Sequence, residues 1–376
     1  MNGTEYTLQS FGQAQRTALV VGGIALAACA LGAMASPAQF FQSYLVAYLF
    51  WVGIALGCFA IVMLHNLVGG SWGMVIRRLL ESGTKTLPLM AALVLPLLFG
   101  LRYLYIWARP DVVAGDELLQ HKSPYLNVPF FLGRTAFYFA VWLLLSYLLN
   151  KWSDNGLPQG RARSLSGPGI LLYGLTVTFA SVDWVMSLEP HWFSTIYGVI
   201  FIVGQALASL AFLIVVLMML ARTEPMAGAL KPSHFHDLGN LMLAFVMLWA
   251  YVAFSQYLII WSGNLPEELP WYVKRLRGGW GWFAGALIVL HFALPFLLLL
   301  ARANKRRLGM LAAIAGGMIV MRLVDLYWIV TPAFHGKQLH LHWMDLLAPV
   351  GVGGIWLAVF LGNLKRHPLH PAGVLS

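Results

Sequence analysis

Long apolar segments alternate with short polar ones along the whole chain. Ten segments are each close to the roughly 20 residues that a helix needs to cross a bilayer. We place them near residues 17–35, 44–66, 87–107, 130–150, 169–188, 195–220, 238–261, 280–300, 308–330 and 345–364. The connections are short, so little of the chain is left to build a separate soluble domain. The pattern predicts an all-α, polytopic membrane protein with a single integral membrane domain over residues 1–376.

The first of these segments ends in Ala33-Met34-Ala35, which resembles a signal-peptide cleavage site. Its apolar run is nevertheless long enough to cross the bilayer. We therefore expect it to be retained as a membrane span.

Composition agrees with lipid as the solvent. Hydrophobic residues make up 60% of the chain and charged residues only 10%, whereas soluble domains carry about a quarter charged residues. The net charge of +10 would suit nucleic acid, but the basic residues are distributed as membrane topology requires. We therefore exclude nucleic acid and expect lipids as partners.

Lysine and arginine gather on one side of the predicted spans. Fifteen lie on the side that carries both termini: Arg16, Arg77, Arg78, Lys85, Lys151, Arg161, Arg163, Arg222, Lys231, Arg302, Lys305, Arg306, Arg307, Lys365 and Arg366. Six lie in the opposite loops: Arg109, Lys122, Lys274, Arg275, Arg277 and Lys337. The positive-inside rule then predicts cytoplasmic termini in a bacterial inner membrane.

Five further charged residues fall within the predicted spans. With a rise of 1.5 Å per residue, all five lie in the outer half of the membrane: Arg102, Arg134, Asp183, Arg322 and Asp325. An unpaired charge at that depth costs several kcal/mol, so these side chains should face the protein interior and be paired or hydrated.

Two of these residues suggest their own partner. Arg322 and Asp325 are three residues apart, which places them on one helical face where they can pair. Asp183 has no partner on its own helix and needs Arg102, Arg134 or another span, or else it is protonated. A carboxylate poised between those two states suits a proton relay. A structural ion pair is the alternative for both carboxylates. The residues expected to line or stabilise proton half-channels are Asp183, Arg322, Asp325, His65 and His291.

Histidines supply further candidates for proton transfer. His65 lies near the inner end of the second span, where it suits the mouth of a proton path, and His291 lies midway along the eighth, where a hydrogen-bonded core role is favoured. Their different depths argue against haem b between them. Glu189 and His191 lie in the outer loop after the fifth span, and the last outer loop holds His335, His340, His342 and Asp345.

Neither thiolates nor histidines follow a metal-binding pattern. Cys29 and Cys58 both lie in apolar spans, and no CxxC or CxxCH sequence occurs. His234 with His236, and His340 with His342, lack the spacings of membrane di-iron enzymes. We expect no metal and no redox cofactor bound by this chain.

Several longer strings resemble one protein family. They are HNLVGGSWG at 65–73, YLNVPFF at 125–131, SVDWVMSLEPHWFS at 181–194, DLGN at 237–240 and FSQYLIIWSGNLPEE at 254–268. Over nearly the whole chain the sequence resembles the ActF-type membrane subunit of bacterial alternative complex III. That complex is a quinol:cytochrome c oxidoreductase, and its ActF subunit is similar to the NrfD-like subunits.

The resemblance implies two four-helix bundles, spans two to five and six to nine, with two extra helices. It implies quinone or quinol nearby, and haem c and iron–sulfur clusters in partner subunits. Those partners are the NrfD-like paralogue ActC, an iron–sulfur subunit and c-type cytochromes. It further implies a chain that is not catalytic alone but supports quinol oxidation and conducts protons.

Two other functions stay open from the residues alone. A stand-alone secondary transporter would suit the many spans, although the prolines at 88, 96 and 295 form no convincing inverted pair of helix breaks. A purely structural anchor for peripheral redox subunits would share the fold and differ only in whether the buried charges titrate.

Overall fold

In the part of the chain that the structure describes, ten helices are long and apolar enough to cross a membrane. The computed structural model describes residues 3–154, 159–221 and 230–366, which contain helices, turns and no strand. The spans are Phe11–Ala35, Pro37–Val68, Ser71–Phe99, Val128–Ser153, Gly160–Leu188, Tyr197–Leu220, Pro232–Gly263, Trp280–Leu300, Leu308–Ala333 and Trp343–Leu364. The predicted all-α polytopic membrane fold is confirmed.

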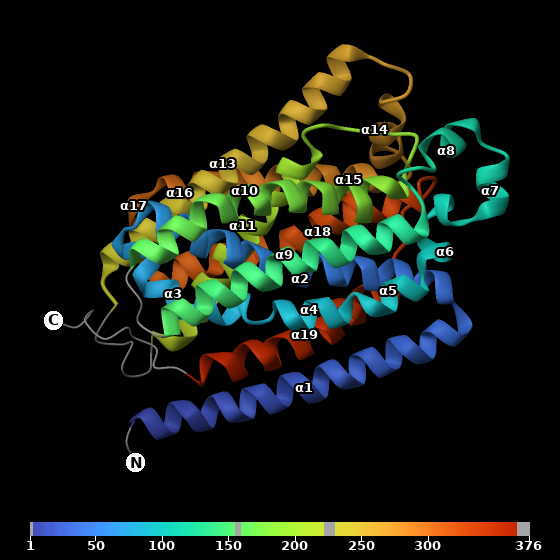
Figure 1. Cartoon of the computed structure of the whole chain (residues 1–376). Helices are drawn as coiled ribbons and strands as arrows, with labels where there is room; N and C mark the ends of the chain where they lie inside the picture. The colour runs from blue at the N-terminus through green and yellow to red at the C-terminus, as the bar shows by residue number, and fades with distance from the viewer. Residues whose placement is uncertain (1–2, 155–158, 222–229, 367–376) are drawn as a thin grey trace.

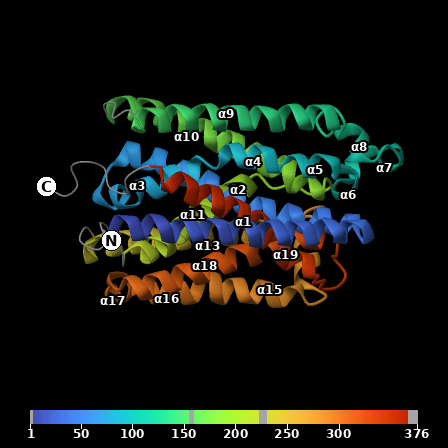
Figure 2. The same ribbon diagram turned by 90° about the horizontal axis from the view of Figure 1, so that it is seen from below.

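The helices pack as two groups of four spans side by side (Figure 2). The first group contains α2 (Pro37–Val68) and the broken third span, made of α3 (Ser71–Thr84), α4 (Leu87–Leu93) and α5 (Leu95–Phe99) and followed by the short α6 (Leu101–Leu104). It is completed by α9 (Val128–Asp154) and α10 (Gln159–Trp184). The second group contains α11 (Tyr197–Leu220), α13 (Pro232–Gly263), the eighth span α15 (Trp280–Ala286), η3 (Leu287–Ala293) and α16 (Leu294–Leu300), then α18 (Leu308–Val330).

Helices α2 and α11 join the two groups. The Ser209 hydroxyl of α11 donates a hydrogen bond to the Ile54 carbonyl of α2 at 2.8 Å. A Cβ added at Gly57 would lie 2.2 Å from the Gln205 carbonyl oxygen, so glycine is what allows this approach. In the most apolar part of the second span 94% of residues are buried, which makes α2 the core of the molecule.

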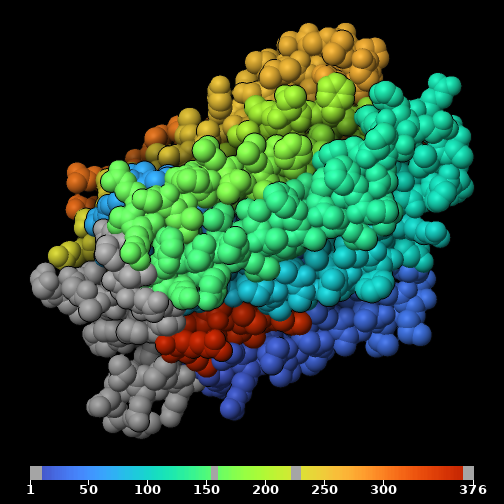
Figure 3. Space-filling view, in the orientation of Figure 1, coloured from blue at the N-terminus to red at the C-terminus, as the bar shows by residue number. Residues whose placement is uncertain are grey.

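The two remaining helices, α1 (Gly3–Ala35) and α19 (Trp343–Leu364), form an antiparallel pair. A Cβ at Gly22 would lie 2.8 Å from the Gly354 Cα, and one at Gly354 would lie 2.4 Å from the Ala18 carbonyl oxygen. Figure 3 shows α19 as a strip between α1 and the first group. The predicted first span is therefore a packed helix of the structure.

The third span begins at Ser71, well before residue 87, where hydropathy places it. Its first turns carry Arg77, Arg78 and Glu81, which lower the local hydropathy. In the structure Glu81 pairs with Arg77 at 3.0 Å and with Arg78 at 2.8 Å. These charges neutralise one another on a single helix. The helix therefore continues through a segment that hydropathy assigns to a loop.

The short elements divide between the two ends of the molecule (Figure 1). The end that holds the start of α1, the end of α19 and α17 (Arg302–Arg306) is called the terminal face here. The other, called the opposite face, holds η1 (Ile106–Ala108), α7 (Pro110–Ala114), α8 (Glu117–Lys122), η2 (Met186–Leu188), α14 (Leu269–Leu276) and η4 (Thr331–Ala333). Arg222, counted above with the terminal side, lies outside the described residues.

Candidate functional site

Asp183 is paired with Arg134, one of the two partners that the sequence left open. Arg134 Nε donates to Asp183 Oδ2 and Nη2 to Oδ1, both at 2.9 Å. The Tyr138 hydroxyl donates to Oδ2 at 2.6 Å. Asp183 is 0% exposed. The pair is a bidentate, charge-assisted contact between α9 and α10, of the strongest kind in proteins.

Aromatic residues close over this arginine. The Arg134 guanidinium carbon lies 3.8 Å from the Tyr125 ring centroid and 4.3 Å from that of Phe130. Arg134 Nη1 also donates to the Tyr125 carbonyl at 2.9 Å. Cation–π contacts strengthen when they are shielded from water, so these rings help to hold the charge inside the bundle.

Arg102 takes no part in this pair. It lies in α6 near the opposite face, and its side chain is exposed. The third span ends at Phe99, so residue 102 lies beyond the span rather than inside it. The expectation that Arg102 is a buried ion-pair partner is therefore wrong.

Polar side chains continue from Arg134 along one stripe of α9. They recur at intervals of four, four, four, four and three residues: Arg134, Tyr138, Trp142, Ser146, Asn150 and Ser153. Such spacing keeps them on one helical face. We call this set the α9 polar column. Nineteen residues at 1.5 Å rise correspond to roughly 28 Å, close to the thickness of the hydrocarbon core.

The middle of the column is aromatic. The Trp142 indole N–H donates to Thr176 Oγ1 at 2.8 Å, and the ring lies 6.1 Å from that of Tyr138. Trp142 is 0% exposed. Because an indole can donate a hydrogen bond but cannot accept one, it cannot pass a proton onward. Trp142 therefore divides the column into two polar halves.

The half toward the terminal face contains amide, hydroxyl and carboxylate groups. Asn150 Nδ2 donates to Thr84 Oγ1 at 2.9 Å and to the Ser146 carbonyl at 2.8 Å. The Ser153 hydroxyl donates to Glu81 Oε1 at 2.5 Å, and Glu81 is only 4% exposed. A cavity of about 10 Å³ between Asn66, Glu81 and these groups is just large enough for one water.

Glu81 is a site residue that the sequence interpretation missed. It was hidden because residues near 77–85 read as a cytoplasmic loop. One signal was available in the sequence: polar residues recur every four positions along the otherwise apolar α9. This spacing indicates a polar helix face, which needs polar partners such as Glu81 on a neighbouring helix.

The second group holds the predicted Arg322–Asp325 pair. Arg322 Nη1 lies 2.5 Å from Asp325 Oδ2, and the side chains are 4% and 3% exposed. A Cβ at Gly204 would lie 2.3 Å from Arg322 Nη1, so the guanidinium rests on the backbone of α11. The pairing inferred from the i, i+3 spacing is confirmed.

Glu189 belongs to a clamp on the opposite face. Its carboxylate contacts Lys274 Nζ and Arg275 Nη2, each at 2.8 Å, and Arg275 is 1% exposed. Arg275 also lies 3.7 Å above the Trp271 ring centroid, and Trp271 stacks on Trp192. Burial alone would raise the pKa of Glu189, but Arg275 and Lys274 hold that pKa below its usual value. The carboxylate therefore links the loop after α10 to α14 as a stable anion.

The remaining predicted residues make local contacts. His191 lies 2.8 Å from Asp116 on the exposed surface. His65 Nε2 lies 3.1 Å from the Gly70 carbonyl oxygen, and its ring packs on Gly73. His65 therefore closes the glycine turn between the second and third spans, and its place at the mouth of a proton path stays a prediction.

Three histidines meet on the opposite face beside the start of α2. The rings of His335 and His340 stack with centroids 4.1 Å apart, and the His340 and His342 centroids are 6.1 Å apart. His335 Nε2 lies 3.0 Å from Gln42 Oε1, and His340 Nε2 lies 3.0 Å from Gln39 Oε1. Asp345 accepts a hydrogen bond from Ser43 at 2.6 Å.

This cluster predicts acid sensitivity. Burial, with a smaller contribution from His340, lowers the pKa of His335 against the opposing effect of Asp345. The unfolded chain, with an ordinary histidine pKa of about 6.5, then binds the proton more tightly than the folded one. Stability should fall as the pH drops below about 6.5 toward the folded pKa. Thermal unfolding at pH 7.5 and 5.5 measures this. His335→Gln should reduce the difference, and exposed His121→Gln should not.

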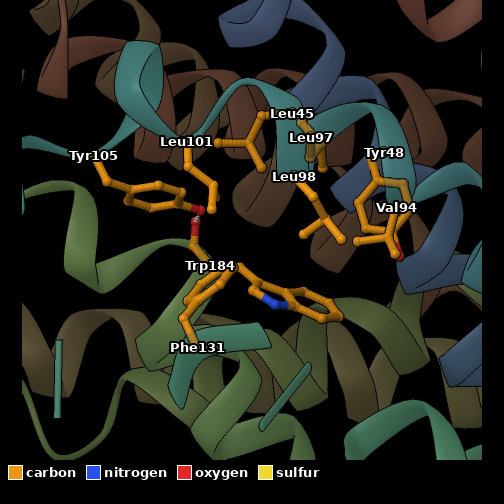
Figure 4. Close-up of a pocket in the computed structure, with 9 residues that line it drawn as sticks. All are labelled: Leu45, Tyr48, Val94, Leu97, Leu98, Leu101, Tyr105, Phe131 and Trp184. Atoms are coloured by element: carbon orange, nitrogen blue, oxygen red, sulfur yellow. Dashed lines mark hydrogen bonds between the residues drawn. The ribbon is translucent and has the colours of Figure 1, made fainter. Parts of the chain in front are cut away.

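An apolar cavity adjoins the Asp183 region (Figure 4). It lies between α2, α5, α6, α9 and α10, where the Tyr105 hydroxyl donates to the Trp184 carbonyl at 2.9 Å. Its volume is about 10 Å³, the size of one water and far below that of a quinone ring. The cavity does not fit a quinone head group in this conformation.

Among residues 3–154, 159–221 and 230–366, no group of three or more His, Cys, Asp or Glu side chains is placed to hold a metal ion. Comparison with known proteins adds no identification. No family model matches the chain, and no curated protein matches it.

Proposed function

We propose that this multi-pass membrane protein is a subunit of a quinol-oxidising respiratory complex in which its first helix group conducts protons. The α9 polar column carries this proposal. It places two buried carboxylates, Asp183 and Glu81, toward opposite ends of one bundle with polar groups leading inward from each. The resemblance to the ActF-type subunit supports the assignment to alternative complex III.

The column acts as two half-channels. Tyr138 and Asp183 serve the opposite face, while Asn150, Thr84 and Glu81 serve the terminal face. Trp142 between them prevents an uninterrupted leak, because a proton crosses only when a water or a rotating hydroxyl bridges that layer. Oxidation of quinol releases protons and electrons. Following the resemblance, we assign the oxidation to a partner such as the ActC paralogue, and the electrons pass to haem and iron–sulfur clusters in partner subunits. The small cavity beside Trp184 is consistent with this assignment.

The proposed orientation puts the terminal face in the cytoplasm of a bacterial inner membrane, following the positive-inside rule. Reporter fusions after residues 160 and 305 should then give a cytoplasmic signal, and a fusion after residue 190 an external one. An external signal at 160 or 305 would reverse the orientation.

Membership of a complex distinguishes this proposal from a stand-alone transporter. The helix breaks at Val94 and Gly100 lie in the second helix of the first group, and the π-helix η3 lies in the third helix of the second. These positions do not correspond, so they give no inverted pair. Affinity purification of the tagged chain from native membranes should carry haem and iron–sulfur absorbance with it. A chain that purifies alone would contradict the proposal.

Conduction is tested within the terminal half of the column. Asn150→Leu keeps the branching of the side chain at Cγ but removes the hydrogen bonds to Thr84 and Ser146. We expect quinol oxidation coupled to proton release to fall at least tenfold per haem in reconstituted complex. Leu145→Met, a change at a buried residue of the same helix that does not line the cavity beside Asn150, is the matched control. Unchanged proton release in a fully assembled Asn150→Leu complex would contradict proton conduction through the column and favour a purely structural anchor.

A further inference from the structure

The eighth span contains an unusual turn around a buried histidine. Residues Leu287–Ala293 form a π-helix between α15 and α16, and His291 lies within it at 0% exposure. Single π turns are rare and are frequent at functional sites. The backbone therefore departs from the α-helix at the residue that carries the polar side chain.

The polar atoms of this histidine are not satisfied by protein groups. Neither Nδ1 nor Nε2 of His291 has a hydrogen-bond partner among the described residues. The sequence led us to expect a core histidine with hydrogen bonds to other side chains or to the backbone. That expectation is wrong, because neither ring nitrogen of His291 bonds directly to a described protein group. A neutral imidazole has one donor and one acceptor, and leaving both unpaired in the membrane interior is costly.

A second unpaired group lies against the first. The Trp249 ring of α13 stacks on His291 with centroids 4.1 Å apart and planes at 34°. Within the described part of the chain its buried Nε1 also has no hydrogen-bond partner. The indole is close enough to interact with the Asp325 carboxylate but makes no direct hydrogen bond to it.

The Arg322–Asp325 pair completes the surroundings. Both residues lie on α18, which packs against η3 and α13. Arg322 Nη1 reaches Oδ2 of Asp325, which leaves the other carboxylate oxygen free to accept from elsewhere. Donors from Trp249 and His291 and acceptors on Asp325 and His291 thus gather where α13, η3 and α18 meet. Buried unpaired polar groups in native proteins are commonly satisfied by internal water.

We propose that the π turn at His291 forms a binding site for internal water, which bridges His291 and Trp249 to the Asp325 carboxylate. One water has two donors and two acceptor sites, so it can accept from the indole N–H while donating to the carboxylate and to the imidazole acceptor. The site lies in the second helix group and does not depend on the proton-conducting function of the first. It makes the Arg322–Asp325 pair a hydrated one.

Infrared spectroscopy of the purified full chain tests the site directly. Exchange of H₂O for H₂¹⁸O should shift an O–H stretching band of internal water, and His291→Phe should abolish that band. Leu290→Phe, a change on the same π turn at a lipid-facing side chain that is 44% exposed, should retain it. A wild-type protein without an isotope-sensitive band, or an unaltered band in His291→Phe, would overturn the proposal.

Thermal stability supplies a second, opposite-signed test. If the pocket were dry, His291→Phe would remove two unsatisfied nitrogens and raise the Tm. If water bridges the groups, the same change removes hydrogen bonds to Asp325 and Trp249, and the Tm should fall by a few degrees. Should His291→Phe not accumulate, ¹⁵N-histidine NMR of the wild type decides. The His291 ring should exchange magnetisation with water, and a ring without such exchange contradicts the site.

Discussion

Asp325→Leu should destabilise the folded chain by about 3–5 kcal/mol, because it leaves Arg322 buried and uncompensated. Arg322 is 3% exposed and is held against Gly204, so it cannot move to water without disturbing the contact between α11 and α18. The measurement is thermal or denaturant unfolding of the purified chain in detergent, together with its yield in membranes.

The double change Arg322→Met with Asp325→Leu is the informative comparison. Apolar residues of similar volume replace a buried ion pair with little loss, and sometimes with a gain. We therefore expect the double variant to be more stable than Asp325→Leu alone. Equal damage from the single and the double change would show that the two charges do not compensate each other.

The ten spans were predictable from the sequence because lipid-facing helices must be apolar over a bilayer-length window. The third span shows where this signal fails. Arg77, Arg78 and Glu81 lower the hydropathy of a segment that is helical and whose carboxylate is buried. Hydropathy averages over a window and does not register that neighbouring charges neutralise each other.

Charge pairs within one helix could be predicted from the sequence. For pairs between helices, the sequence could only limit the number of possible partners. The i, i+3 spacing of Arg322 and Asp325 determines their proximity once the helix exists. The partner of Asp183 depends on which face α9 turns toward α10, and the choice between Arg102 and Arg134 was therefore open. Arg275 and Lys305 were assigned to loops, yet they are 1% and 6% exposed. In the sequence, a buried lysine or arginine near the end of a span cannot be distinguished from a loop residue that sets the membrane topology.

The sequence motifs that suggested a family resemblance lie where helices and loops contact one another. Tyr125 and Phe130 cover Arg134, and Trp192 stacks on Trp271. Likewise, Asn240 Oδ1 accepts a hydrogen bond from Lys305 Nζ at 2.7 Å. These motif residues therefore help to position buried charges where the elements meet.

Asp183→Asn should greatly reduce proton release and quinol turnover per haem if Asp183 relays protons through the opposite-face half-channel. Asparagine keeps the shape and can still accept from Tyr138, but it removes the titratable carboxylate. It also removes the negative charge that pairs with Arg134, whose side chain is 10% exposed. A loss of assembly would therefore accompany any loss of turnover, and the single variant alone cannot separate a relay from a structural pair.

The double variant Arg134→Gln with Asp183→Asn separates them. It removes both charges and leaves two amides that can hydrogen-bond across the same contact between α9 and α10. If Asp183 only stabilises the bundle, this charge-balanced variant should recover assembly and turnover together. If Asp183 relays protons, assembly should recover while turnover and proton release stay at least tenfold below wild type. Purified complexes reconstituted in vesicles, normalised to haem, provide both readouts. Full turnover in the assembled double variant would refute the relay, because no titratable group would remain at that position to carry the proton.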